Sequence, residues 1–127
     1  EEIGLDIGLY DLTRLGRRFA GGDGGADNEV QEVFAVRSDL PLGAYRLHPD
    51  EVEAVVSVCL TDALALFEGR ETAVTGEELG RDCRTPTAVR VTVSGFAAGE
   101  VGGYPARALR GLLEVVTGGV PEPFELR

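Results

Sequence analysis

Residues 1–5 read Glu1-Glu2-Ile3-Gly4-Leu5, a pattern typical of the last turn of a helix and the chain that leaves it. Glycine reaches the left-handed backbone conformation without steric cost, so Gly4 is predicted to end the helix, and Leu5 would enter the core. Glu1 and Glu2 would place adjacent carboxylates on the closing turn, where they can bind a metal ion. The alternative is a solvated acidic segment followed by an ordinary glycine cap.

These five residues resemble the end of the Nudix box, E-E-x-G-U, in which U is a large apolar residue. The full box reads G-x5-E-x7-R-E-U-x-E-E-x-G-U, and its opening glycine, first glutamate and Arg-Glu pair would lie before residue 1. The resemblance implies that residues 1–120 are the C-terminal part of a single Nudix domain, followed by a tail at 121–127. The N-terminal strands and most of the box helix would be missing.

Two further stretches are similar to the Nudix branch that includes the isopentenyl-diphosphate isomerases. Residues 27–37 (DNEVQEVFAVR) resemble an E-N-E-V run that leads into a V-F-x-x-R strand. Residues 49–64 resemble a D-E-V run, an apolar strand and a D-L-x-x-L segment, in that order. In this branch both glutamates of E-N-E-V bind the metal, which implies Asp27 and Glu29 as ligands here. A solvated pair of turn acids is the alternative, and aspartate at position 27 shortens one ligand.

The composition indicates one globular domain at most, because the chain has 127 residues, of which 43% are hydrophobic and 27% charged. A net charge of −10 argues against a nucleic-acid partner, since no basic patch is available to displace counterions from phosphates. No run of 18 apolar residues and no signal-peptide pattern is present, so we expect no membrane partner and a cytoplasmic location. Cys59 and Cys83 lack metal-site spacing and are expected to be free thiols.

Apolar patterns predict strands within 9–19, at 30–37, at 52–60 and at 88–94, and the last two alternate between apolar and polar faces. The first two should form an antiparallel pair across the glycine-rich loop 20–26. The strand 30–37 is apolar on both faces, which predicts that it is covered on both sides.

Three helical segments are predicted between and after these strands. Thr61 should cap a short helix that Gly69 stops, and the capping-box pattern at 75–78 (TGEE) predicts one more helical turn. The last helix should begin near Pro105 and end at Gly118, with one core-facing stripe: Leu109, Leu112, Leu113 and Val116. The fold class is therefore α/β of the α+β type, a partial Nudix fold in which helices pack on a mixed or antiparallel sheet.

The resemblance implies a hydrolase that cleaves a diphosphate linkage in a nucleoside or isoprenoid diphosphate with Mg²⁺ or Mn²⁺. Glu1 and Glu2 would be catalytic, and they would hold the metal together with Asp27 and Glu29. Glu51 or Glu53 could add a further acid across the cleft. The 127-residue chain by itself is expected to be inactive.

An isomerase-like enzyme and a non-catalytic interaction domain are the alternatives. Isomerases of the family use histidine ligands and a catalytic cysteine in the missing half, and they lack the paired glutamates. Because the missing half would cover the strands 30–37 and 52–60, we expect a homo-oligomer formed through them. The expected partners are thus a small diphosphate substrate and a second copy of the chain.

Overall fold

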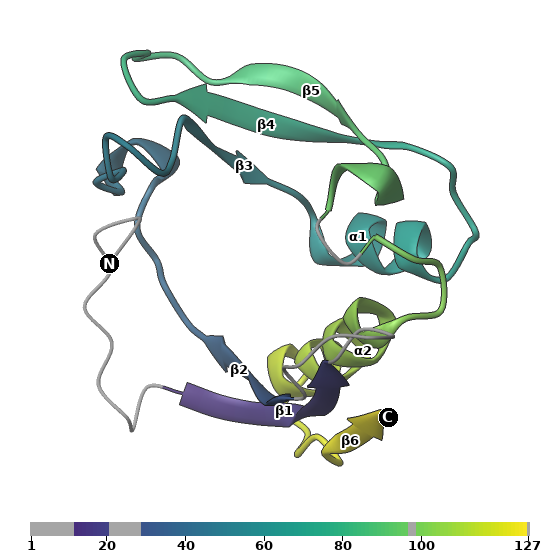
Figure 1. Cartoon of the computed structure of the whole chain (residues 1–127). Coiled ribbons are helices and arrows are strands. Elements are labelled where there is room, and N and C mark those ends of the chain that lie inside the picture. Colours follow the sequence, from purple (N-terminus) through teal and green to yellow (C-terminus); the bar gives the residue numbers. More distant parts are fainter. Residues whose placement is uncertain (1–11, 21–28, 97–98, 127) are drawn as a thin grey trace.

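The structure is a computed structural model that describes residues 12–20, 29–96 and 99–126 (Figure 1). These residues contain, in order: β1 (Leu12–Ala20), β2 (Glu29–Val36), the 3-10 turn η2 (Leu42–Ala44), β3 (Ala54–Ser57), α1 (Leu60–Phe67), β4 (Val74–Gly80), β5 (Thr87–Val91), the 3-10 turn η3 (Val93–Gly95), α2 (Tyr104–Val116) and β6 (Phe124–Leu126). The described strands form two three-stranded sheets, in the orders β2-β1-β6 and β3-β4-β5. Two helices and two largely antiparallel sheets confirm the α+β class.

The first sheet is built on the antiparallel pair of β1 and β2, as the sequence predicts. Their register runs from Leu12 opposite Val36 to Ala20 opposite Glu29, with a bulge between Arg14 and Gly16. The bulge accommodates Leu15, which is only 4% exposed and so anchors the strand in the core.

The segment 121–127, expected to be a tail, supplies β6, which runs parallel to β1 with Gly16 opposite Phe124. A Cβ atom added at Gly16 would lie 2.5 Å from the ring and the carbonyl oxygen of Phe124. Glycine therefore permits the close approach, and Phe124 is buried there.

The second sheet contains residues 75–78, so the prediction of a helical turn there was wrong. These residues lie in β4, the central strand, which pairs antiparallel with both β3 and β5. A helix cap contributes about 1 kcal/mol, whereas a central strand gains two ladders of hydrogen bonds and here buries Leu79. A Cβ at Gly76 would lie 2.8 Å from the carbonyl oxygen of Ser57, so glycine permits the close packing of β4 on β3.

The strand predicted at 52–60 is shorter in the structure, because β3 ends at Ser57 and α1 begins at Leu60. Thr61 was predicted to be the N-cap, but Cys59 takes that position and Thr61 lies in the first turn. Gly69 does end this segment, with a φ of 79° that favours glycine. The strand predicted at 88–94 is present as β5, half-buried through Val89 and Val91, but it ends at Val91, and Val93 and Ser94 lie in η3.

The core lies where α1 packs against α2 and α2 packs against β1 (Figure 1). Leu64, Leu66 and Phe67 of α1 are buried, and the rings of Phe67 and Phe96 meet edge to face with centroids 4.9 Å apart. The predicted stripe of α2 is half-buried rather than core, and its last member, Val116, is 62% exposed.

No helix in the described part of the chain is long and apolar enough to cross a membrane. Within the same residues the fully formed core is small: Leu15, Leu64, Ala65, Leu66, Phe67, Leu79, Ala106 and Phe124.

Candidate functional site

Of the four residues predicted to bind a metal, Glu29 lies within the described chain, whereas Glu1, Glu2 and Asp27 lie outside it. Glu29 is the first residue of β2 and is exposed. Its Oε1 atom accepts a hydrogen bond of 2.8 Å from the side-chain amide of Gln31. Residues two apart in a strand share a face, so Gln31 is placed by the strand itself to orient the Glu29 carboxylate.

The next acid of β2, Glu32, lies on the opposite face and is engaged in ion pairs. Arg14 Nε and Arg17 Nη2 of β1 lie 2.7 and 3.3 Å from its carboxylate. The side chains involved are between 35% and 40% exposed, so these pairs contribute about 1 kcal/mol or less each. The two acids therefore differ in their contacts: Glu32 forms ion pairs with arginine side chains, whereas Glu29 accepts a hydrogen bond from the neutral amide of Gln31.

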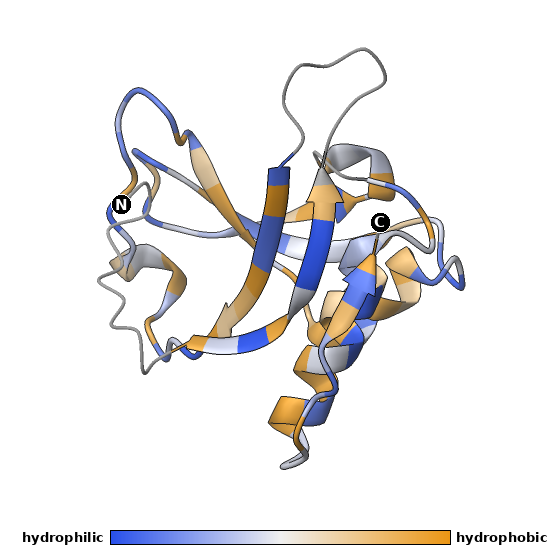
Figure 2. Cartoon of the chain, turned by 60° about the horizontal axis from the view of Figure 1, so that its bottom comes forward, coloured by the Kyte–Doolittle hydropathy of each residue, from blue (hydrophilic) through white to orange (hydrophobic). Residues whose placement is uncertain are grey.

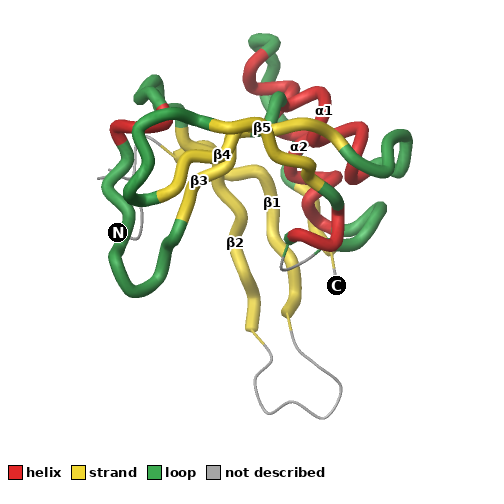
Figure 3. Tube along the Cα trace, turned by 90° about the horizontal axis from the view of Figure 1, so that it is seen from above, coloured by secondary structure: helices red, strands yellow, loops and turns green. Residues whose placement is uncertain are grey.

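Glu51 and Glu53, suggested as a further acid, are exposed and lie in the turn before β3. Figures 1 and 3 show this turn apart from the start of β2, so the structure does not bring them to Glu29. The turn is instead tied to the end of β4 through Arg81. The Arg81 backbone N–H donates to the Glu53 carbonyl oxygen at 2.7 Å, and its guanidinium donates to the carbonyl oxygen of Pro49.

The residues that the structure describes contain no group of three or more His, Cys, Asp or Glu side chains able to hold a metal ion. His48 has a structural contact, because its Nδ1 accepts the backbone N–H of Asp50 at 3.3 Å. Glu29 is thus the part of the predicted site that can be placed here.

Two neighbouring hollows adjoin β3 and share Val56 and Val58 in their linings. The polar hollow has a volume of about 570 Å³ and the apolar hollow about 410 Å³, both within the range of small-molecule sites. Ser38, Leu40, Leu42, Tyr45, Val55, Val56, Ser57, Val58 and Glu77 line the polar hollow. Val56, Val58, Ala63, Phe67, Phe96, Tyr104, Pro105, Ala108 and Leu109 line the apolar hollow.

Neither hollow coincides with the predicted metal ligand. Ser38, at the rim of the polar hollow, is separated from Glu29 by the length of β2, and a strand rises about 3.3 Å per residue. The eight residues of β2 alone separate Glu29 from this end of the strand by roughly 20 Å. A diphosphate held at Glu29 would not reach the polar hollow.

Cys59 and Cys83 are free thiols, as predicted, and both are exposed. The Cys59 sulfur lies 3.3 Å from Thr61 Oγ1 at the start of α1. This side-chain hydrogen bond is the largest cause of a pKa of the Cys59 thiol below its usual 9.0. The backbone N–H groups of Thr61 and Asp62 lower it further.

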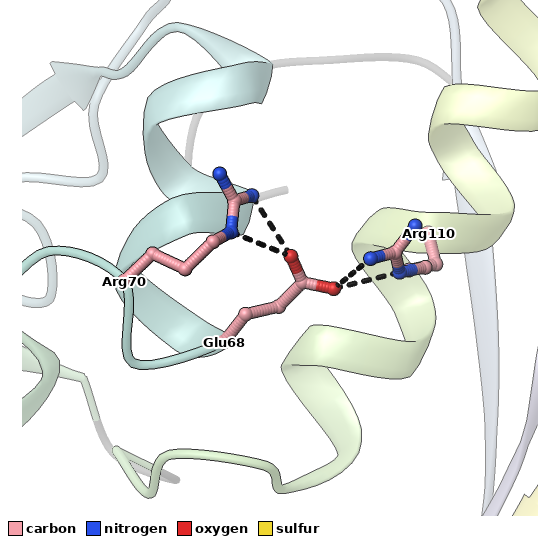
Figure 4. A network of polar contacts seen from close by, with 3 residues as sticks. All are labelled: Glu68, Arg70 and Arg110. Atoms are coloured by element: carbon pink, nitrogen blue, oxygen red, sulfur yellow. Dashed lines mark hydrogen bonds and ion pairs between the residues drawn. The ribbon is translucent and has the colours of Figure 1, made fainter.

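A network that the sequence did not indicate joins the two helices at Glu68 (Figure 4). Its Oε1 accepts from Arg70 Nη2 at 2.8 Å, and its Oε2 accepts from Arg110 Nε at 2.6 Å. The hydrogen bond from Arg70, together with the bond and charge of Arg110, lowers the pKa of the Glu68 carboxyl. The contact between Glu68 and Arg110 spans 42 residues, so no local pattern predicts it.

Comparison with protein-family models gives no match for this chain, and comparisons with curated proteins and with solved structures give none either.

Proposed function

We propose that the chain is part of a Nudix-type hydrolase that cleaves a diphosphate linkage, with a divalent metal, in a nucleoside or isoprenoid diphosphate. The observation that carries the proposal is the position of Glu29. Its carboxylate stands exposed at the first residue of a strand that continues through Val33 and Phe34. This order, a metal-binding acid followed directly by an apolar strand, is what the resemblance implies.

The donor set also fits the metal. Glu1, Glu2, Asp27 and Glu29 offer only carboxylate oxygens, the hard ligands that Mg²⁺ and Mn²⁺ prefer. The bound ion would neutralise charge on the diphosphate and lower the pKa of a bound water. The chain would hold the ion through these carboxylates, and Gln31 would orient the Glu29 group through its amide hydrogen bond.

Metal binding by the 127-residue chain provides the test. Titration with Mn²⁺, followed by electron paramagnetic resonance, should give saturable binding that Glu29→Gln weakens about tenfold, because one charged ligand is lost. Glu114→Gln, which removes an exposed carboxylate from α2, is the matched control and should leave the affinity unchanged. Equal weakening by both substitutions would indicate only the general attraction of an acidic chain for cations, and would reject Glu29 as a ligand.

A non-catalytic interaction domain is the second candidate, favoured by the exposed apolar side chains of the β1–β2 hairpin. Phe19, Val30 and Phe34 are 38%, 50% and 47% exposed. Binding of a protein partner over these side chains is favourable, since each Å² of apolar surface removed from water contributes about 25 cal/mol. Absence of saturable Mn²⁺ binding, together with self-association through this hairpin, would favour this function over the hydrolase.

A further inference from the structure

Strand β2 is the longest strand with an open edge among the described residues. It ends the order β2-β1-β6, so β1 pairs with one side of it and none of the described strands pairs with the other. Figure 3 shows the β1–β2 hairpin extending beyond the rest of the described chain, toward the connection between its strands. An edge of eight residues whose outward N–H and C=O groups pair with none of the described strands is a template for another strand.

The face beside this edge is apolar and exposed. Val30 and Phe34 lie on the same face of β2, and Phe19 stands directly opposite Val30 in β1. The three side chains are exposed, contrary to the prediction that this strand is covered on both sides. Figure 2 shows the hydrophobic bands crossing the hairpin between hydrophilic ones. A second strand added at the edge would extend this surface and shield part of it from water.

We infer that the occupant of this edge is a second copy of the chain, whose β2 pairs antiparallel with the first about a two-fold axis at Val33. The two sheets would then join into one, in the order β6-β1-β2-β2-β1-β6 across the axis. The contact is isologous, so every pair between the copies occurs twice, except the pair of Val33 with itself on the axis.

The axis position follows from the pleat and the charges. A two-fold axis perpendicular to the sheet keeps each side chain on its face, so each register is centred on one residue. Centring on Val33 sets Glu29 opposite Arg37 of the second copy, and Val30 opposite Val36. Opposite charges across a strand pair are favourable, and so are apolar pairs.

Registers centred on the residues next to Val33 are disfavoured. An axis at Glu32 sets this carboxylate directly opposite itself, and an axis at Phe34 sets Glu29 opposite Asp39. Like charges in these positions repel. Axes farther from the middle of β2 shorten the overlap and lose hydrogen bonds.

The ion pair at the ends of the interface is sterically compatible with a metal at Glu29. A carboxylate has two oxygen atoms, so one can accept an N–H group from Arg37 while the other remains directed at an ion. The self-association does not depend on the proposed function, because it requires only the backbone of β2 and its flanking charges.

The mass of the 127-residue chain, measured by sedimentation equilibrium between about 5 and 200 µM, tests the inference; the range spans the affinities of weak dimers. The wild type should approach twice the monomer mass of 13.4 kDa. Glu29→Arg alone or Arg37→Glu alone should raise the dissociation constant at least tenfold, because each places two like-charged pairs across the interface. Arg90→Glu, a charge reversal on the edge strand β5 of the other sheet, is the matched control and should leave the mass unchanged.

The decisive arm mixes the two single variants. In a mixed dimer, the introduced arginine of one chain would face the introduced glutamate of the other, and the unaltered Arg37 and Glu29 would face each other at the opposite end. Association should therefore return, and the double variant should also associate. Circular dichroism confirms that each variant is folded. A monomeric wild type at about 200 µM would overturn the inference and leave the edge to a different partner, and a dimer unaffected by either single reversal would overturn the register.

Discussion

At the scale of single residues, Cys59 shows how a helix start changes the chemistry of a side chain. Its thiol lies at the N-cap of α1, beside the Thr61 hydroxyl and the backbone N–H groups of Thr61 and Asp62. These donors stabilise the thiolate, whereas the nearby Asp62 carboxylate opposes it. The net effect is a lowered pKa for the thiol, which increases the fraction of thiolate at neutral pH.

We expect iodoacetamide to alkylate Cys59 several-fold more slowly in Thr61→Val than in the wild type at about pH 7.5. Valine has nearly the shape of threonine but lacks the hydroxyl that donates to the thiolate. Each substitution is made in a Cys83→Ser background, so that mass spectrometry follows one thiol. Identical pH–rate profiles with and without the hydroxyl would show that Thr61 does not influence the thiol.

At the scale of elements, Glu68 at the end of α1 links this helix to α2 through an ion pair with Arg110. Its side chain is 18% exposed and contacts Arg70 and Arg110, whose side chains are 61% and 63% exposed. Because folding lowers the pKa of Glu68, its contribution to stability is present above the carboxyl's unfolded pKa of about 4.5. That contribution is lost as the pH falls from this value through the lower pKa of the folded state, where the group is protonated.

Glu68→Gln should therefore lower the melting temperature by a few degrees at pH 7, and the difference from wild type should shrink as the pH is lowered below about 4.5. Glu71→Gln, an exposed neighbour, serves as the control and should have little effect at either pH. Thermal unfolding followed by circular dichroism measures both. A deficit in Glu68→Gln that persists undiminished at about pH 3 would assign its effect to packing rather than to charge.

At the scale of the whole molecule, the described core is small and centred on Phe67, which is 2% exposed. The ring packs on Phe96, and the Phe67 carbonyl oxygen accepts the N–H of Gly102 at 2.8 Å. One residue thus joins α1 to η3 and to the chain that enters α2.

Phe67→Ala should lower the free energy of unfolding by about 3–5 kcal/mol, a large part of the roughly 5–15 kcal/mol typical of a domain. Val116→Ala, at a position that is 62% exposed, should cost less than about 0.5 kcal/mol. Urea unfolding of both variants measures the difference. If the two substitutions cost the same, Phe67 would not be the centre of the core.

Local patterns in the sequence determined those elements in which the tertiary contacts agree with the local conformational preference. Apolar patterns predicted β1, β2, β5 and a longer version of β3, and glycine and proline marked the ends of the helices, because these signals depend on backbone geometry within a few residues. They also placed Glu29 at the start of a strand. The candidate metal site can be compared with the structure only in the position of Glu29, since its other acids, Glu1, Glu2 and Asp27, lie outside the described residues.

Tertiary structure decided what the local patterns could not. Residues 75–78 carry a helix-capping sequence but form part of the central strand β4, because pairing with β3 and β5 outweighs one cap. Phe124 joins a sheet beside Gly16, a residue far earlier in the chain, and Glu68 contacts Arg110 across a helix pair. The free energy of each contact depends on a partner brought close only by folding, so residue types and spacing alone do not reveal it.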